Sequence, residues 1–357
     1  MSYYPFKIDN MQMGWRRETA FRTTAEGLDT TNANSAVYYS FGIKNFKMKL
    51  LRFKRNKNWV TAHGYTDWAS IEEKQYEALE WELEGDLCDL MMLKMLVAAL
   101  ITNTDATSYR TRVYATTTSR SAEKPSIQVF QYLVNDTGAQ TIANLLLGTQ
   151  LKKMKITWAQ AANVKCTFTF ESAKPIAFTA LTSPGFPAKI PVDAAGAVLR
   201  PYNISDIVVS LKKGGTAYQG VTVGGSITYD DGAKLHHGDG EAYAGRIVQG
   251  FRQIMIENLR VMLKEKALYD DVNGLAATAA SDVDLTIKMS RNTTSDYLEF
   301  AFQKLLAEEA SFEEWENEFN LVGTYNYKLK PASFETGAVL TITQADSHAV
   351  QDARVTT

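Results

Sequence analysis

Residues 148–158, GTQLKKMKITW, and residues 164–171, VKCTFTFE, decide the fold class of this chain. In both segments, apolar side chains alternate one by one with polar or charged side chains. Successive side chains of a β-strand point to opposite faces, so this alternation predicts two half-buried strands. The short polar turn between them predicts an antiparallel hairpin. No catalytic motif lies nearby, which favours a structural β protein.

Length and composition indicate a globular protein with room for two cores. The chain has 357 residues, of which 45% are apolar and 22% charged, and its net charge of −2 gives no argument for nucleic-acid binding. Cys88 and Cys166 lie in apolar segments, so we expect both to be reduced. Residues 87–101 are apolar but carry Asp89 and Lys94, and they are shorter than the ~20 residues of a membrane span, so we expect a buried helix.

The order of the predicted elements divides the chain into five parts. These are an N-terminal arm (1–35), a first domain (36–174), a Pro/Gly-rich linker (175–201), a second domain (202–331), and a C-terminal strand with a polar tail (332–357). We expect an α+β, mainly β fold, with helices at 87–101, 259–269 and 297–319. The order strand, long loop, strand, helix, strand, closing strand occurs twice, which predicts a duplicated unit whose residue identities barely match.

Two sets of charged residues are candidates for contact with solvent, DNA or another subunit. Glu80, Glu82 and Glu84 alternate with apolar residues and must face water, either on an exposed sheet face or on a pore wall that repels DNA phosphate. Basic residues on predicted strands suit a solvated edge or a charged contact between subunits. The candidates for such an inter-subunit contact are Lys47, Lys49, Arg52, Lys153, Lys155 and Lys165.

Nothing in the sequence predicts catalysis. His236 and His237 lie in a Gly-rich loop, and metal sites need three or four converging ligands on a fixed frame. Nucleophile-elbow, phosphate-binding and dinucleotide-binding motifs are absent from the sequence. We therefore expect no enzyme activity, no cofactor and no metal.

Several segments together resemble a known family. They are GWRRETAFRT at residues 14–23, LEGDL at residues 83–87 followed by an apolar stretch, the strand pair that Gly148 opens, and the strand-rich second half. This arrangement resembles the tail tube proteins of long-tailed, siphovirus-like phages and related archaeal viruses.

The resemblance implies two tandem β-sandwich or partial-barrel domains, each with a flanking helix. It implies a structural subunit of the virion tail, assembled in the host cytoplasm into rings that stack as a tube. A trimeric, pseudo-hexameric ring suits a duplicated chain best, and a hexameric ring is the alternative. Viral DNA would pass through the lumen without sequence-specific binding during ejection, other tail proteins would be partners, and no membrane would be involved.

Two alternatives remain open at this stage. A tail terminator or baseplate component would form a single ring without stacking. A carbohydrate-binding or hydrolytic β-sandwich would need aromatic residues beside paired carboxylates, and Trp81 with Glu80 and Glu82 is the one candidate for that.

Overall fold

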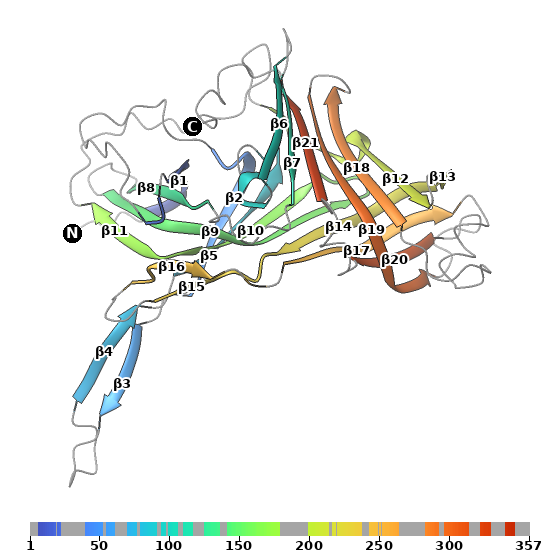
Figure 1. Ribbon diagram of the computed structural model, residues 1–357. Helices are drawn as coiled ribbons and strands as arrows, with labels where there is room; N and C mark the ends of the chain where they lie inside the picture. The colour runs from blue at the N-terminus through green and yellow to red at the C-terminus, as the bar shows by residue number, and fades with distance from the viewer. Residues whose placement is uncertain are drawn as a thin grey trace.

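The protein is described from a computed structural model, which is almost entirely β. Seventeen strands belong to one sheet that curls into a half-barrel (Figure 1). The described residues are 6–18, 20–22, 40–52, 55–60, 70–76, 79–90, 94–97, 99–105, 110–116, 125–135, 141–178, 199–213, 216–218, 220–237, 243–248, 250, 252–263, 283–292, 296–313, 322–329 and 340–346.

The strands of the first half run to the start of the expected linker. They are β1 (Phe6–Arg17), β2 (Ile43–Arg52), β3 (Arg55–Val60), β4 (Ser70–Tyr76), β5 (Leu79–Leu87), β6 (Ala99–Asp105), β7 (Arg110–Ala115), β8 (Ile127–Asn135), β9 (Thr141–Ala159), β10 (Lys165–Ser172) and β11 (Lys174–Phe178). One helical turn, α1 (Lys94–Val97), lies between β5 and β6.

The second half begins with a 3-10 turn, η2 (Ile204–Asp206). Its strands are β12 (Ile207–Lys213), β13 (Thr216–Ala217), β14 (Gly220–Asp230), β15 (Lys234–His236), β16 (Arg246–Val248), β17 (Gln253–Leu263), β18 (Val283–Asn292), β19 (Asp296–Glu313), β20 (Val322–Leu329) and β21 (Leu340–Asp346). The hairpins β3–β4 and β15–β16 stand outside the main sheet.

A run of eight antiparallel strands crosses both halves of the chain, and we call it the curved sheet. Its order is β2–β5–β10–β9–β14–β17–β20–β19. Within this run, the pairing of β9 with β14 joins the strands of the first half to those of the second; outside it, β7 of the first half also pairs with β21 of the second. The hairpin expected from residues 148–158 and 164–171 is confirmed as β9 and β10.

Two long strands leave the curved sheet and continue into side layers. The first part of β9 lies between β8 and β11, and β1 extends that layer beyond β8. The first part of β19 lies between β18 and β21, with β12 beyond β18 and β7 and β6 beyond β21. Each long strand therefore connects two layers, and the buried apolar residues of both halves form one continuous cluster between them.

The bend of β9 depends on Gly148. Its φ is +60°, a conformation that costs a residue with a Cβ roughly 1–2 kcal/mol. A Cβ there would also lie 2.9 Å from Ala173 Cβ and from a ring carbon of Phe21. The Gly148 N–H donates to the buried carboxylate of Glu18 at 2.8 Å, which also accepts from Ser126. Burial raises the pKa of Glu18 despite these hydrogen bonds.

The expected helices are wrong where the structure describes them. Among the described residues of 87–101, only those of α1 are helical, and β6 begins at Ala99. The start of the second expected helix lies in β17, and most of the third is β19. In β19 the buried residues Leu298, Phe300 and Phe302 alternate with more exposed ones, so the period is two rather than 3.6. Residues 264–269 and 314–319 lie outside the described residues.

The expected boundaries also need correction. The supposed N-terminal arm contains β1, which pairs with β8 and buries Trp15 completely. The expected linker begins within β11, and residues 179–198 lie outside the described residues. Two separate tandem domains are not supported, because one sheet includes strands of both halves. The expected C-terminal strand is confirmed as β21.

The strand pairings of the two halves follow the same order. The neighbours β1–β8–β9–β11 correspond to β12–β18–β19–β21, and β2–β5–β10–β9 corresponds to β14–β17–β20–β19. The irregularity between Ile127 and Val129 recurs between Val283 and Leu285. Each long strand also has a β-bulge of one residue where it pairs with the strand that follows it, β9 against β10 and β19 against β20.

We predict that Gly148→Ala destabilises the fold by about 1–3 kcal/mol, through backbone strain and the loss of close packing at the bend. The control is Ala161→Gly in the β9–β10 turn, where the native residue already has a φ of 58°. That change should be neutral or stabilising by up to about 1 kcal/mol. Urea unfolding of both variants measures this; equal effects would contradict the strain argument.

Candidate assembly surface

The curved sheet has one apolar face and one polar face. Trp81, Phe168 and Ile156 on three successive neighbours are fully buried in the core. Lys155, next to Ile156, and Glu84, three residues after Trp81, are exposed on the opposite face. The alternation in β5, β10 and β9, which the buried Thr169 interrupts, leaves a polar and charged surface on one side of the half-barrel.

On the polar face, the acidic row of β5 lies directly across from the basic row of β2. The register pairs Lys47 with Glu84, Lys49 with Glu82, and Arg52 with Glu80. Cross-strand opposite charges stabilise a sheet by roughly 0.2–1 kcal/mol per pair. The three glutamates, which the sequence suggested for a pore wall, therefore form an alternating charge pattern with β2 instead of a purely negative strip. Glu80 also lies 3.6 Å from Lys152.

The same face crosses the junction between the two halves with its own ion pairs. Lys153 of β9 lies 2.9 Å from Asp230 of β14, and Lys155 lies 3.3 Å from Glu257 of β17. Both lysines were candidates for contacts between subunits. They make their contacts within the chain, at the β9–β14 junction where the two halves meet within the curved sheet.

Beneath these pairs, the β9–β14 junction is closely packed. Trp158 is fully buried and lies against Gly225 of the facing strand. A Cβ on Gly225 would lie 2.6 Å from the Trp158 ring, so only glycine fits without movement. Ile156 and Ile227 face each other in the register and are both fully buried. The junction thus combines a dry apolar side with a charged, solvent-facing side.

Lys165, the last of the basic candidates, holds a buried carboxylate. Its ammonium forms an ion pair with Asp86, which also accepts from Asn45 Nδ2 at 2.8 Å and from Asn163. Burial alone would raise the pKa of Asp86, but the hydrogen bonds from Lys165 and Asn45 outweigh it and lower the pKa. Asn45 sits at the irregularity of β2 with a φ of 51°. This cluster therefore fixes the start of β2.

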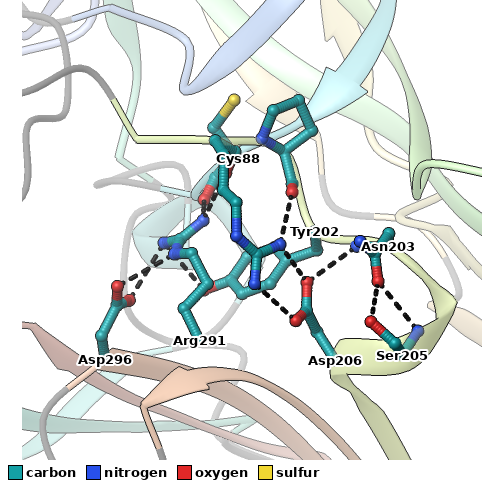
Figure 2. A network of polar contacts seen from close by, with 9 residues as sticks. Cys88, Tyr202, Asn203, Ser205, Asp206, Arg291 and Asp296 are labelled. Carbon is teal, nitrogen blue, oxygen red and sulfur yellow. Dashed lines mark hydrogen bonds and ion pairs between the residues drawn. The ribbon is translucent and has the colours of Figure 1, made fainter.

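A second polar network lies where the end of β5, the segment before η2 and β18 meet (Figure 2). Arg291 donates to the Cys88 carbonyl at 2.7 Å and to the Arg200 carbonyl at 2.8 Å, and it holds Asp296 through two nitrogens. Its guanidinium carbon lies 4.1 Å from the centre of the Tyr202 ring. Burial opposes the charge of Arg291, but Asp296 and Tyr202 outweigh it and raise the pKa.

The geometry of this network indicates that it stabilises the fold. Arg291 is 8% exposed, and its donors are used by backbone carbonyls and one carboxylate. Beside it, Arg200 holds Asp206 through two nitrogens at 2.6 and 2.7 Å, and Asp206 closes the capping box of η2. Sequence reasoning missed this network because its members are far apart in the chain and fit no motif.

The carbohydrate alternative loses its one candidate site. Trp81 is fully buried, stacks on Phe170 with ring centres 4.4 Å apart, and donates its indole N–H to Ser172. A ring in that position offers no face to a sugar. His236 lies in the small β15–β16 hairpin. Within the described ranges, no group of three or more metal-ligating side chains converges. Cys88 and Cys166 are free, and burial raises the pKa of both thiols.

None of the helical segments in the described part of the chain has the length and apolar character needed to span a bilayer. A comparison with models of known protein families finds no match, and a search of curated proteins finds no relative.

We predict that Asp86→Asn destabilises the fold at pH 7 by about 1–3 kcal/mol, because hydrogen bonds to a charged carboxylate are lost. The pKa of Asp86 is lowered in the fold, so its contribution is complete above the ordinary value of 3.8 and disappears as pH falls through the lowered value. Unfolding measured from pH 7 down to pH 2 should therefore show wild type and variant converging. A difference that stays constant with pH would contradict the assignment.

Arg291→Ala should destabilise the fold by about 3–5 kcal/mol, because Asp296 and the carbonyls of Cys88 and Arg200 lose the partner that a largely buried guanidinium provides. The comparison is Arg200→Ala: this side chain is 52% exposed, but its partner Asp206 is only 7% exposed and loses a two-nitrogen contact, so we expect a smaller loss of about 1–3 kcal/mol. Urea unfolding followed by tryptophan fluorescence measures both. Similar losses in the two variants would contradict the importance of burial.

Proposed function

We propose that this chain is the structural subunit of a viral tail tube, which assembles into stacked rings around a lumen for genome passage. The observation that carries the proposal is the repeated order of strand pairings, with its repeated irregularities. It supports two copies of one tube-like unit, fused edge to edge through β9 and β14. This is a duplication of pairing order within one sheet, rather than two separate domains.

A chain of two equivalent units is suited to ring formation. Units that join through two different edges associate head to tail, and such heterologous contacts close into rings when the rotation per unit allows it. The half-barrel curl of the sheet supplies curvature in one direction (Figure 1). Three chains would provide six units, in agreement with the trimeric, pseudo-hexameric ring that the family resemblance favours.

The polar face of the curved sheet is suited to line the lumen. It carries alternating acidic and basic rows on β5 and β2, together with the ion pairs of Lys153 and Lys155. Carboxylates that lie opposite or beside the cations of this face reduce its attraction for DNA phosphates, so DNA can pass without adhering. Glu80, Glu82 and Glu84 are the proposed acidic residues of this surface.

The β3–β4 hairpin supports stacking of rings. Its strands pair from Arg55↔Tyr76 to Val60↔Ser70, and the hairpin extends away from the body of the sheet (Figure 1). An extended hairpin beside a flat ring can reach the next ring, which distinguishes a tube from a single terminator or baseplate ring.

Electron microscopy of the concentrated purified protein tests the proposal. We expect hollow tubes of stacked rings with a central lumen. A deletion within residues 55–76 should leave single rings, because it removes the proposed contact between rings. Single rings from the unaltered chain would favour a terminator or baseplate role, and a chain that stays monomeric at high concentration would overturn the proposal.

A further inference from the structure

Two strand edges of the curved sheet have no partner among the described strands. One is the outer edge of β2, which pairs only with β5. The other is the outer edge of residues 306–313 of β19, which pair only with β20. Unpaired edges bind further strands readily, so proteins either protect them or use them for assembly. These two edges lie at opposite ends of the run of eight strands.

The two edges carry opposite charges. Strand β2 contains Lys44, Lys47, Lys49 and Arg52 and no acidic residue, and Lys47 and Lys49 are exposed. Residues 306–313 contain Glu308, Glu309 and Glu313 and no basic residue. Each edge therefore repels a copy of itself and attracts the other, which fits a head-to-tail contact between copies of this chain.

The junction inside the chain supplies a register for this contact. In the repeated order of pairings, β9 corresponds to β19 and β14 corresponds to β2. When β9 with its partner β10 is aligned on β19 with its partner β20, Thr157 corresponds to Glu313 and Ile156 corresponds to Phe312. When β14 with its partner β17 is aligned on β2 with its partner β5, Ser226 corresponds to Lys49 and Ile227 corresponds to Leu50. In the chain, Ser226 lies opposite Thr157 and Ile227 opposite Ile156. The same geometry between two copies would place Lys49 opposite Glu313 and Leu50 opposite Phe312.

We propose that β2 of one copy pairs antiparallel with residues 306–313 of β19 in the next copy, with Lys49 opposite Glu313 and Leu50 opposite Phe312. The proposal rests on the assembly described under Proposed function and names its subunit seam. It repeats the division seen at β9–β14, where an isoleucine pair lies on the core side and polar residues lie on the solvent side.

The two seams are distinguished by reversed charge. At the internal seam, β9 supplies the cations Lys153 and Lys155, and the other half supplies Asp230 and Glu257. At the seam between copies, β19 supplies the anions and β2 the cations. The β9 edge of each copy is covered by β14 of the same chain, so the edges of the curved sheet left for pairing among the described strands are β2 and residues 306–313 of β19. Their opposite charges favour the pairing of β2 with β19 over the pairing of either edge with its own copy.

A charge exchange tests the seam. Lys49→Glu should reduce the assembled, pelletable fraction at least about tenfold, because each seam of the ring gains a like-charge pair and the losses multiply on closure. The double variant Lys49→Glu with Glu313→Lys should recover assembly. Lys47→Glu is the matched control: it loses an equivalent cross-strand partner, Glu84 instead of Glu82, and the proposed register places Lys47 beyond Glu313, outside residues 306–313. Glu313→Lys should not rescue the control.

Cross-linking reports on the register independently. Lys49→Cys with Glu313→Cys, treated with a short bis-maleimide, should give denaturing-gel bands up to a trimer and none larger. The native thiols are buried, so the reagent reaches the new ones selectively. Tubes that form normally with Lys49→Glu and without cross-links would overturn the seam while leaving the tube intact. An unaltered chain that forms no assembly by electron microscopy would overturn the tube and the seam together.

Discussion

The antiparallel pairing of β9 with β14 is the contact on which the rest of the structure depends. It turns two sets of strands into one curved sheet, with Trp158 closely packed on Gly225 on one side and the Lys153–Asp230 ion pair on the other. Without this pairing, both halves would expose a further strand edge to solvent. The bend of β9 at Gly148 then directs the same strand into the side layer that covers the core.

The β9–β14 pairing, the internal seam of the chain, is also a template for the way in which further copies can join. The internal seam forms within one chain and needs no selectivity against other partners. A seam between copies must select the right edge from solution, which complementary charge at β2 and residues 306–313 of β19 can provide. The network around Arg291 complements this arrangement, because it fixes β18 of the second half to the end of β5 in the first.

The sequence predicted strands well where one face is buried and the other is wet, as in β9 and β10. It failed in β19, because Leu298, Phe302 and Leu305 also fit the spacing of a helix face. Phe300 is also buried, which fits the two-residue period of a strand and not a helix. Its burial results from pairing with β18 and β21, which the sequence alone does not reveal. Strand β1 was missed because its buried residues are few in a polar surrounding. The sequence identified the charged candidate residues, but not the residues they contact. Those partners depend on the register between strands, which no local pattern specifies.

An electron cryomicroscopy reconstruction of the assembled protein tests the central claim, the equivalence of the internal seam and the seam between copies, most directly. The account predicts three chains per ring, pseudo-six-fold density, and continuous antiparallel pairing of β2 with β19 of the neighbouring chain at the register of β14 with β9. A closed ring in which the outer edges of β2 and β19 lie apart, or in which neighbouring chains meet through the side layers alone, would contradict it.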